Sequence, residues 1–203
     1  MPRTSTLRRA LVIAAAGATM ALSAAPASEA KPSRQLPCVP GTTCPEEQPK
    51  CANRNVEPAS GNLAIVRRAT LCLLNQERAE RDLSRFRDNR PLRGVAAKYA
   101  RSMVKLSFFD HISPLGSTFV ERIKRSAYLR GADGYNLGEN LAWGAGPLST
   151  PRLIVRAWML SPGHRANILN GSFRDIGVGV ALGVPVAGGG LGATYVNEFG
   201  ARS

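Results

Sequence analysis

The pattern of apolar positions predicts two long helices in the first half of the chain. Apolar and small residues recur at helical spacing after Asn62, which can cap a helix that fades near Asp82. Pro91 opens a second segment with an apolar face, which runs to about Leu106. Proline is favourable at a helix start because the N–H that it lacks has no partner there.

Shorter helices are predicted in the middle of the chain. Ser117 is expected to cap a helix that carries Phe119, Val120 and Ile123. Pro151 opens the next helix, which the Ser-Pro-Gly sequence at residues 161–163 ends. A further short turn of helix is expected at residues 165–169.

The remaining segments predict strands and turns. Residues 128–138 are rich in glycine and are expected to be irregular, and residues 139–143 favour a short strand. Residues 175–182 alternate glycine with Ile and Val, and residues 192–199 are β-prone, so together they predict an antiparallel hairpin. Helices come first and strands last, which indicates an α+β class with helices packed on a small sheet. Two glycines are expected to permit close packing of the first hairpin strand: Gly177 and Gly179.

Residues 1–30 are typical of a secretory signal peptide. A basic start with Arg3, Arg8 and Arg9 precedes a short Ala-rich apolar run and two A-x-A-like processing sites. A membrane anchor is the alternative, but a spanning helix needs about 20 apolar residues and this run is shorter. We therefore expect a bacterial protein that is secreted to the extracellular space or cell envelope, with no transmembrane segment after cleavage.

The mature chain is predicted to be an N-terminal arm, residues 31–60, followed by one domain, residues 61–203, and to be a monomer. The arm is rich in Pro and Ser without periodicity. The whole chain carries a net charge of +13, and removing the signal, with its three Arg and one Glu, leaves +11. Such a charge favours anionic partners. The charges are scattered and no basic stripe with interleaved aromatics occurs, which argues against nucleic acid.

Four cysteines in an exported chain imply disulfides, and four allow three pairings. All lie in the N-terminal part of the chain, and the favoured pairing is Cys38 with Cys44 and Cys51 with Cys72. A zinc site is the alternative, but the usual C-x(2–4)-C pairs are missing.

Candidate chemistry centres on the only two histidines, His111 and His164, which both lie in turn-rich segments. Histidine is a frequent ligand and general base because its unperturbed pKa is about 6.5. Glu139 lies between them in the sequence. The segments around these residues and in the hairpin are 108–116 (FFDHISPLG), 137–144 (LGENLAWG), 157–169 (AWMLSPGHRANIL), 175–180 (DIGVGV) and 194–200 (TYVNEFG).

These segments, in this order and after the opening LLNQER at residues 73–78, resemble the CAP superfamily of cysteine-rich secretory, antigen 5 and pathogenesis-related proteins. They are most similar to its bacterial branch of secreted SCP-like domains. The resemblance implies an α-β-α sandwich, with an antiparallel sheet between helical layers, and a cleft lined by two His and two acidic residues. His111, Glu139 and His164 match three of these four positions. Ser161 stands at the fourth, where the family usually has Glu.

Three interpretations of this cleft follow. Two imidazoles, a carboxylate and a water would suit a divalent metal such as zinc, although Ser161 is a poor ligand and no cofactor is required otherwise. A Ser/His hydrolase could use Ser113 or Ser161, yet neither lies in a G-x-S-x-G context. In a purely structural role, Glu139 would cap backbone N–H groups and His164 would tie the fourth helix to the sheet.

The features together favour a secreted, non-enzymatic module that binds a ligand or the cell envelope, with anionic lipid or cell-wall polymer as its partner. The incomplete set of four cleft residues and the lack of a clear nucleophile are the reasons. A metal-assisted or Ser/His hydrolase of peptidase type is the alternative, so the sequence leaves enzymatic activity open.

Overall fold

The computed structural model describes residues 51–203. The predicted signal peptide, most of the predicted arm and the predicted Cys38–Cys44 pair lie outside these described residues. The Cys51–Cys72 pair is confirmed, with a Cα–Cα separation of 5.8 Å. It joins the start of the described chain to the middle of the first helix.

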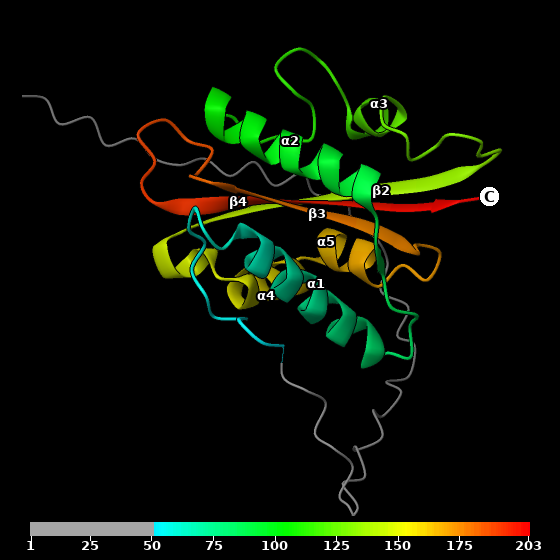
Figure 1. Cartoon of the computed structure of the whole chain (residues 1–203), viewed down its shortest axis with the longest axis horizontal. Coiled ribbons are helices and arrows are strands. Elements are labelled where there is room, and N and C mark those ends of the chain that lie inside the picture. The colour runs from blue at the N-terminus through cyan, green and yellow to red at the C-terminus, as the bar shows by residue number, and fades with distance from the viewer. Residues whose placement is uncertain (1–50) are drawn as a thin grey trace, which may run out of the picture. The chain divides into compact units, whose positions relative to one another are not determined.

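A four-stranded sheet in the order β1-β3-β4-β2 forms the centre of the domain (Figure 1). Its strands are β1 (Arg87–Asp88), β2 (Tyr135–Ala145), β3 (Asp175–Leu182) and β4 (Gly192–Arg202). The predicted hairpin of β3 and β4 is confirmed as an antiparallel pair, and β4 also pairs antiparallel with β2. The sheet differs from the prediction in two respects. β2 begins at Tyr135, within the segment expected to be irregular, and the short parallel strand β1 was not foreseen.

Helices cover both faces of the sheet, which confirms the α+β class and the α-β-α sandwich (Figure 1). One layer contains α1 (Leu63–Ala79), α4 (Pro151–Leu160) and α5 (Pro162–Ile168). The other contains α2 (Arg90–Leu106) and α3 (Phe119–Lys124), and a short 3-10 helix spans Gly146–Ser149. Among residues 51–203, none of the helices has the length and apolar character needed to span a membrane.

Of the predicted helix caps, Asn62 lies at the N-cap position of α1 without a capping side chain, and Ser117 was wrong. The side chain of Asn62 does not cap α1, because it accepts a hydrogen bond from the N–H of Ala59 and donates to the carbonyl of Glu57. Thr118, rather than Ser117, caps α3 and forms a reciprocal capping box with Glu121. In this box each side chain accepts from a backbone N–H that the short helix would otherwise leave without a partner, which stabilises α3.

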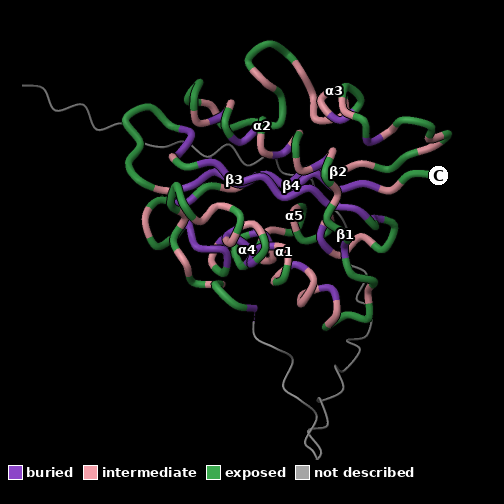
Figure 2. The backbone as a smooth tube through the Cα atoms, in the orientation of Figure 1, coloured by how far each residue is buried: buried purple, intermediate pink, exposed green. Residues whose placement is uncertain are grey.

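Apolar side chains fill the space on both sides of the sheet, and β3 and β4 are buried along most of their length (Figure 2). Trp158 of α4 lies in the larger core, where its indole N–H donates to the carbonyl of Leu141. Val196 and Leu141 belong instead to the core beneath α2. Successive side chains of a strand point to opposite faces, so Glu198 and Glu139, two residues away from these, also face the α2 layer.

Arg78 at the end of α1 is fully buried, although it has no carboxylate partner among the described residues. Its guanidinium donates to four backbone carbonyls instead, at Ser84, Ile168, Asn170 and Phe173. These bonds hold α1 against the connection between α5 and β3. Burial lowers the pKa of Arg78, but an arginine pKa starts so high that the charge remains.

The backbones of β3 and α2 approach each other at two glycines, as predicted. A Cβ added at Gly177 would collide with the backbone of Leu92 and Arg93, and one added at Gly179 with that of Ala96 and Ala97. Backbone atoms cannot move aside as a flexible side chain can. The alternation of glycine in β3 therefore sets how closely α2 packs on the sheet.

Replacing Gly179 with alanine should lower the free energy of unfolding by about 3 kcal/mol or more, because the new methyl group overpacks a backbone contact. Gly94→Ala is the matched control. Gly94 lies in α2 with nothing within 4 Å of the new Cβ, so this change should stabilise the domain by about 0.5–1 kcal/mol. Urea unfolding followed by circular dichroism measures both. Equal effects of the two substitutions would contradict this account of the β3–α2 contact.

Candidate functional site

The candidate site is built around Glu139, whose side chain is 0% exposed although β2 is an edge strand. In the register of the sheet, Glu139 lies directly opposite Glu198 of β4. Two carboxyl groups thus share one buried face of the sheet. An ionised carboxylate in such surroundings is strongly destabilising unless a cation and hydrogen bonds compensate it.

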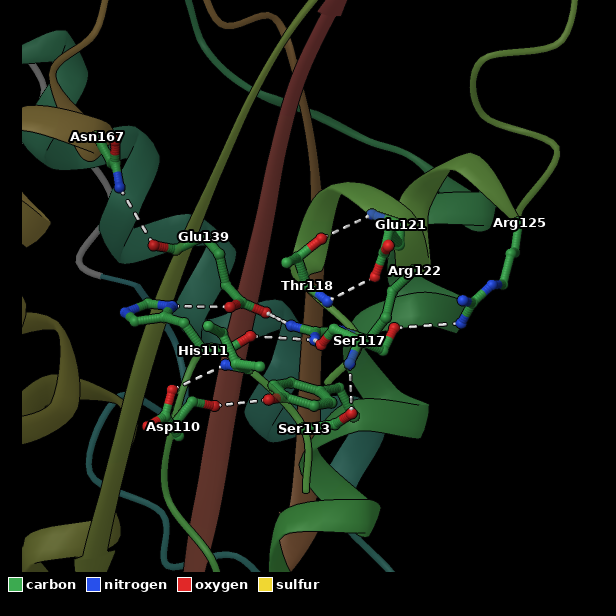
Figure 3. Close-up of polar contacts among 12 residues, drawn as sticks. Asp110, His111, Ser113, Ser117, Thr118, Glu121, Arg122, Arg125, Glu139 and Asn167 are labelled. Atoms are coloured by element: carbon green, nitrogen blue, oxygen red, sulfur yellow. Dashed lines mark hydrogen bonds and ion pairs between the residues drawn. The ribbon is translucent and has the colours of Figure 1, made fainter. Parts of the chain in front are cut away.

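Both oxygens of the Glu139 carboxylate have a partner (Figure 3). Oε1 lies 2.8 Å from Nδ1 of His111, and Oε2 accepts a hydrogen bond of 2.6 Å from Nη2 of Arg122. Because the carboxylate accepts, the imidazole donates from Nδ1, and its Nε2 is left facing away from Glu139. The structure therefore places the predicted residues His111 and Glu139 in direct contact. Glu139 bonds side chains, not the backbone N–H groups that the structural interpretation expected.

Arg122 of α3 also holds the loop that carries His111. Its Nη1 donates to the backbone carbonyls of His111, at 3.1 Å, and Ser117, at 2.7 Å. The guanidinium lies over the ring of Tyr99, 3.3 Å from the centroid, and the Tyr99 hydroxyl donates to the carbonyl of Asp110. We call the side chains of His111, Arg122, Glu139 and Glu198 the Glu139 cluster.

Glu198 is the second carboxyl of the cluster, and no cation pairs with it within residues 51–203. The polar side chain that it faces is the Glu139 carboxylate, to which Glu198 can donate a hydrogen bond only when it is protonated. Burial, followed by the charge of Glu139, raises the pKa of Glu198 well above its ordinary value. Glu198 therefore retains its proton to higher pH than an ordinary glutamate does, while the Glu139 carboxylate accepts hydrogen bonds from Arg122 and His111.

His164 lies on α5, and main-chain contacts join this helix to β2. The side chain of Asn140 donates to the His164 carbonyl, and Asn167 donates to the backbone carbonyl of Glu139 and to the side chain of Asn140. Figure 3 shows Asn167 at the main chain of Glu139, while His111 and Arg122 contact its carboxylate. The bonds from Asn140 and Asn167, rather than the His164 imidazole, connect α5 to the sheet.

The two imidazoles are electrostatically coupled. The hydrogen bond to Glu139 raises the pKa of His111, whereas burial and then the nearby charge of His111 lower the pKa of His164. His111 therefore becomes a cation first as the pH falls. Its protonated form is stabilised in the folded protein, while that of His164 is not.

Ser161 lies between α4 and α5, and its side chain makes no capping hydrogen bond. In the described part of the chain it has no hydrogen bond to His111, Glu139 or His164. The Ser113 hydroxyl accepts a hydrogen bond from the N–H of Ser117, and it forms none with an imidazole among the same residues. The structure thus pairs neither serine with a histidine base.

The donors present fit a zinc site poorly. With both Glu139 oxygens engaged, the available protein donors are two imidazole nitrogens, whereas catalytic zinc usually has three protein ligands. Residues 51–203 contain no group of three or more His, Cys, Asp and Glu side chains arranged to hold a metal ion. Metal binding by His111, His164 and Glu139 stays a prediction.

A cavity with a volume of about 460 Å³ adjoins the cluster. Arg122 and Tyr99 belong to its lining, but His111, Glu139, Ser161 and His164 do not. We call this cavity the α2 pocket. The site therefore has two parts that share Arg122, of which the sequence predicted only the one around the histidines.

Sequence reasoning missed Arg122 and Glu198, although both are central to the cluster. The signal for Glu198 was an acidic residue within a β-prone segment that is otherwise almost uncharged. Arg122 is one of several basic residues around α3, and nothing local distinguishes it from Lys124 or Arg125.

Comparison with known proteins is consistent with this geometry. The sequence model of the cysteine-rich secretory protein family, CAP, matches residues 71–184. The chain is a member of the CAP family. This confirms the resemblance found in the sequence, and the matched range includes His111, Glu139, Ser161 and His164.

Relatives of this CAP domain occur in bacteria. YkwD of Bacillus subtilis (strain 168) is 33% identical over 121 residues, which are 60% of this chain and 44% of YkwD. The membrane protein YlbC of the same strain is 29% identical over 54% of this chain and 30% of its own length. The chain thus spans less than half the length of either relative.

Two solved structures share the fold. An extracellular SCP-domain protein from Bacillus anthracis str. Ames is 27% identical, with a TM-score of 0.50 over 68% of this chain and 40% of that one. An outer surface protein of Borrelia burgdorferi is 21% identical, with a TM-score of 0.53 over 72% of this chain and 96% of that one. The second likeness concerns the fold alone.

The two histidines should titrate separately, with the pKa of His111 above 6.5 and that of His164 below it. Glu139→Gln should lower the pKa of His111, because the amide cannot stabilise the imidazolium as a carboxylate does. Two-dimensional NMR of the ring protons against pH measures both values. If the substitution left the His111 pKa unchanged, the hydrogen bond to Glu139 would not be its main determinant.

Glu198 should make the domain less stable as the pH rises above about 4.3, the ordinary pKa of a glutamate. The unfolded chain then releases a proton that the folded protein retains, so folding loses up to about 1.4 kcal/mol per pH unit until the raised pKa is reached. Glu198→Gln should remove this loss and be more stable than the native chain at pH 7. Urea unfolding at several pH values tests this, and Glu57→Gln is the control, because the exposed Glu57 side chain forms no hydrogen bond or ion pair with another described residue.

Proposed function

We propose that this chain is a secreted, non-enzymatic CAP module that binds anionic groups of a bacterial envelope at the His111 face of the Glu139 cluster. The observation that carries the proposal is that the Glu139 carboxylate is fully occupied by His111 and Arg122. It is therefore unavailable as a general base or metal ligand unless one of these contacts breaks. The site offers a ligand the Nε2 atom of His111, on the side of the imidazole that faces away from Glu139.

The electrostatics support an anionic ligand. The His111 side chain is 52% exposed, and the hydrogen bond to Glu139 raises its pKa, which favours the cationic form relative to an ordinary histidine at the same pH. Of the acidic groups near it, Glu139 is paired with Arg122 and burial raises the pKa of Glu198, while the exposed carboxylate of Asp110 adds to the rise in the pKa of His111. With a net charge of +11 after removal of residues 1–30, the surrounding field also attracts anions.

Export is part of the proposal. Residues 1–30 have the features of a signal peptide, and the two structural relatives are described as an extracellular protein and an outer surface protein. Phosphate-bearing lipids and wall polymers are abundant anions in such a location. We infer that one of these two classes is the partner.

One observation favours a second candidate function, a hydrolase. A carboxylate that orients an imidazole through Nδ1 is the arrangement that catalytic triads use to position a base. His111 could activate a water through Nε2, but neither Ser113 nor Ser161 is placed beside it as a nucleophile. A screen of peptide and ester substrates tests this candidate, and turnover that disappears in His111→Ala would favour it over binding alone.

The binding proposal predicts that the purified chain sediments with vesicles of phosphatidylglycerol or with wall fragments, and not with phosphatidylcholine vesicles. Binding should tighten as the pH falls through the His111 pKa. His111→Gln should weaken it at pH 6 by about fivefold, since one basic charge at an anionic surface contributes about 1 kcal/mol.

His164→Gln is the matched control, because the pKa of His164 is lowered while that of His111 is raised, so this substitution should weaken binding less than His111→Gln at the same pH. High salt should weaken all binding through screening. Absence of binding to both anionic materials at low salt would overturn the proposal.

A further inference from the structure

Strand β3 has an open edge along most of its length. β1 pairs with only its first two residues, so residues 177–182 have no neighbouring strand on that side. The N–H of Asn89 donates to the carbonyl of Ile176, which shows that the main chain of Ile176 points toward this edge. Main-chain groups alternate along a strand, so those of Val178 and Val180 point the same way. In the described part of the chain, no hydrogen bond reaches them from this side.

A cavity of about 450 Å³ adjoins the open edge, and we call it the edge groove. Val178 and Val180 line it from β3, which runs between α2 and α1 in Figure 1, and residues of both helices form its walls. Its volume lies within the range of roughly 300–1,000 Å³ typical of ligand sites. Val178 is buried, and main-chain groups that are removed from water without a partner are unfavourable. The edge groove thus offers hydrogen-bonding groups that another strand would satisfy.

The charged residues that line the edge groove are all arginines, namely Arg67, Arg90, Arg93 and Arg101. Arg67 and Arg93 share one partner, the carboxylate of Asp88. Neither Arg90 nor Arg101 forms an ion pair with another residue of the described range. The groove therefore attracts acidic groups. It also disfavours pairing with the same edge of a second copy of this chain, because arginines would then meet arginines.

The two walls of the edge groove differ in character. Three of the four arginines belong to α2, whereas α1 contributes Leu63 and Ala64 besides Arg67. Successive side chains of a strand point to opposite faces of a sheet. A strand in the groove would therefore direct every second side chain toward the arginines of α2 and the others toward the more apolar wall of α1. The sequence that fits best alternates acidic with apolar, β-branched residues.

We propose that the edge groove binds an extended acidic segment of a partner protein, which adds a strand to β3. Its main chain pairs with Val178 and Val180, and its carboxylates contact Arg90 and Arg101. In strand addition the main-chain hydrogen bonds supply affinity and the alternate side chains supply specificity. None of the side chains of the Glu139 cluster lines this groove, so the inference does not depend on the proposed function.

The N-terminal arm of this chain fits the edge groove poorly. Its acidic residues, Glu46 and Glu47, are adjacent rather than alternating, and they lie between Pro45 and Pro49. Adjacent side chains would point to opposite walls. Proline cannot donate to a ladder of main-chain hydrogen bonds. A partner protein is therefore the better occupant.

Calorimetry in 0.15 M salt with the blocked peptide Glu-Val-Glu-Val-Glu tests this proposal on the chain from residue 31 onward. One peptide should bind per chain, and Lys-Val-Lys-Val-Lys should not bind measurably, because it meets arginines with like charge. Glu-Glu-Val-Val-Glu has the same composition without the alternation, and should bind about fivefold more weakly or less tightly still. Absence of binding by the alternating acidic peptide would overturn the proposal.

Two N-methylated peptides separate strand addition from attraction between charges alone. In a strand added to β3, the N–H groups of the Glu residues or those of the Val residues point toward β3, depending on the direction of the peptide. Methylation of that set removes the main-chain bonds, whereas methylation of the other set faces away from β3 and is tolerated as proline is on an edge strand. One methylated peptide should therefore bind at least about tenfold more weakly than the other. Equal affinities would overturn strand addition.

A charge-matched pair of variants locates the site. Arg90→Glu with Arg101→Glu reverses both uncompensated cations, and should weaken binding of the alternating acidic peptide at least about tenfold. Lys105→Glu with Arg156→Glu makes the same change in net charge at exposed positions outside the groove lining. This control should alter the affinity by less than about threefold. Circular dichroism confirms that both variants fold, and equal losses in the two would overturn the assignment to the groove.

Hydrogen exchange followed by NMR identifies the occupant. In the free chain the amides of Val178 and Val180 should exchange faster than those of Gly177 and Gly179, which face β4. The alternating acidic peptide should slow them at least about tenfold. Slow exchange in the free chain would overturn the assignment to a partner protein. It would favour a second copy if it depended on protein concentration, and the arm if it did not.

Discussion

The ion pair between Arg122 and Glu139 is the interaction on which the site depends. A carboxylate buried against the sheet is strongly unfavourable unless a cation and hydrogen bonds satisfy it. Arg122 supplies both, and its other terminal nitrogen donates to the carbonyls of His111 and Ser117. Compensation of one buried charge thus fixes α3, the loop after α2 and the His111 ring in a single arrangement. Removing Arg122 would leave that charge uncompensated and the loop unattached.

The same cluster is the basis of the proposal that the site binds an anionic ligand. Glu198 lies opposite Glu139, and burial, followed by the charge of Glu139, raises its pKa well above the ordinary value. The negative charge of the cluster is therefore internal and balanced. The positive groups beside it, at His111 on one side and the α2 pocket on the other, face solvent and dominate what an approaching ligand meets.

Local patterns predicted most of the fold. Helical spacing located α1, α2 and α4, and the Gly-Ile-Val alternation located β3 and its close contact with α2. Predictions were wrong where neighbouring elements decide the outcome. The side chain of Asn62 found partners before the helix rather than in it, and the edge strand β2 extends to Tyr135 because β4 pairs with it along its whole length. The two-residue β1 is too short to leave a periodic signal.

The sequence by itself determined the family and the sandwich fold, and it singled out His111 and Glu139, which the structure brings into contact, because these are carried by motifs of a few adjacent positions. Only the tertiary structure decided what those residues do. The partners of Glu139 come from α3, from the loop after α2 and from β4, and strand register and helix packing bring them together. A sequence shows which residues can carry charge. Which charges share one low-dielectric space, and so neutralise or suppress each other, depends on distances that exist only in the folded chain.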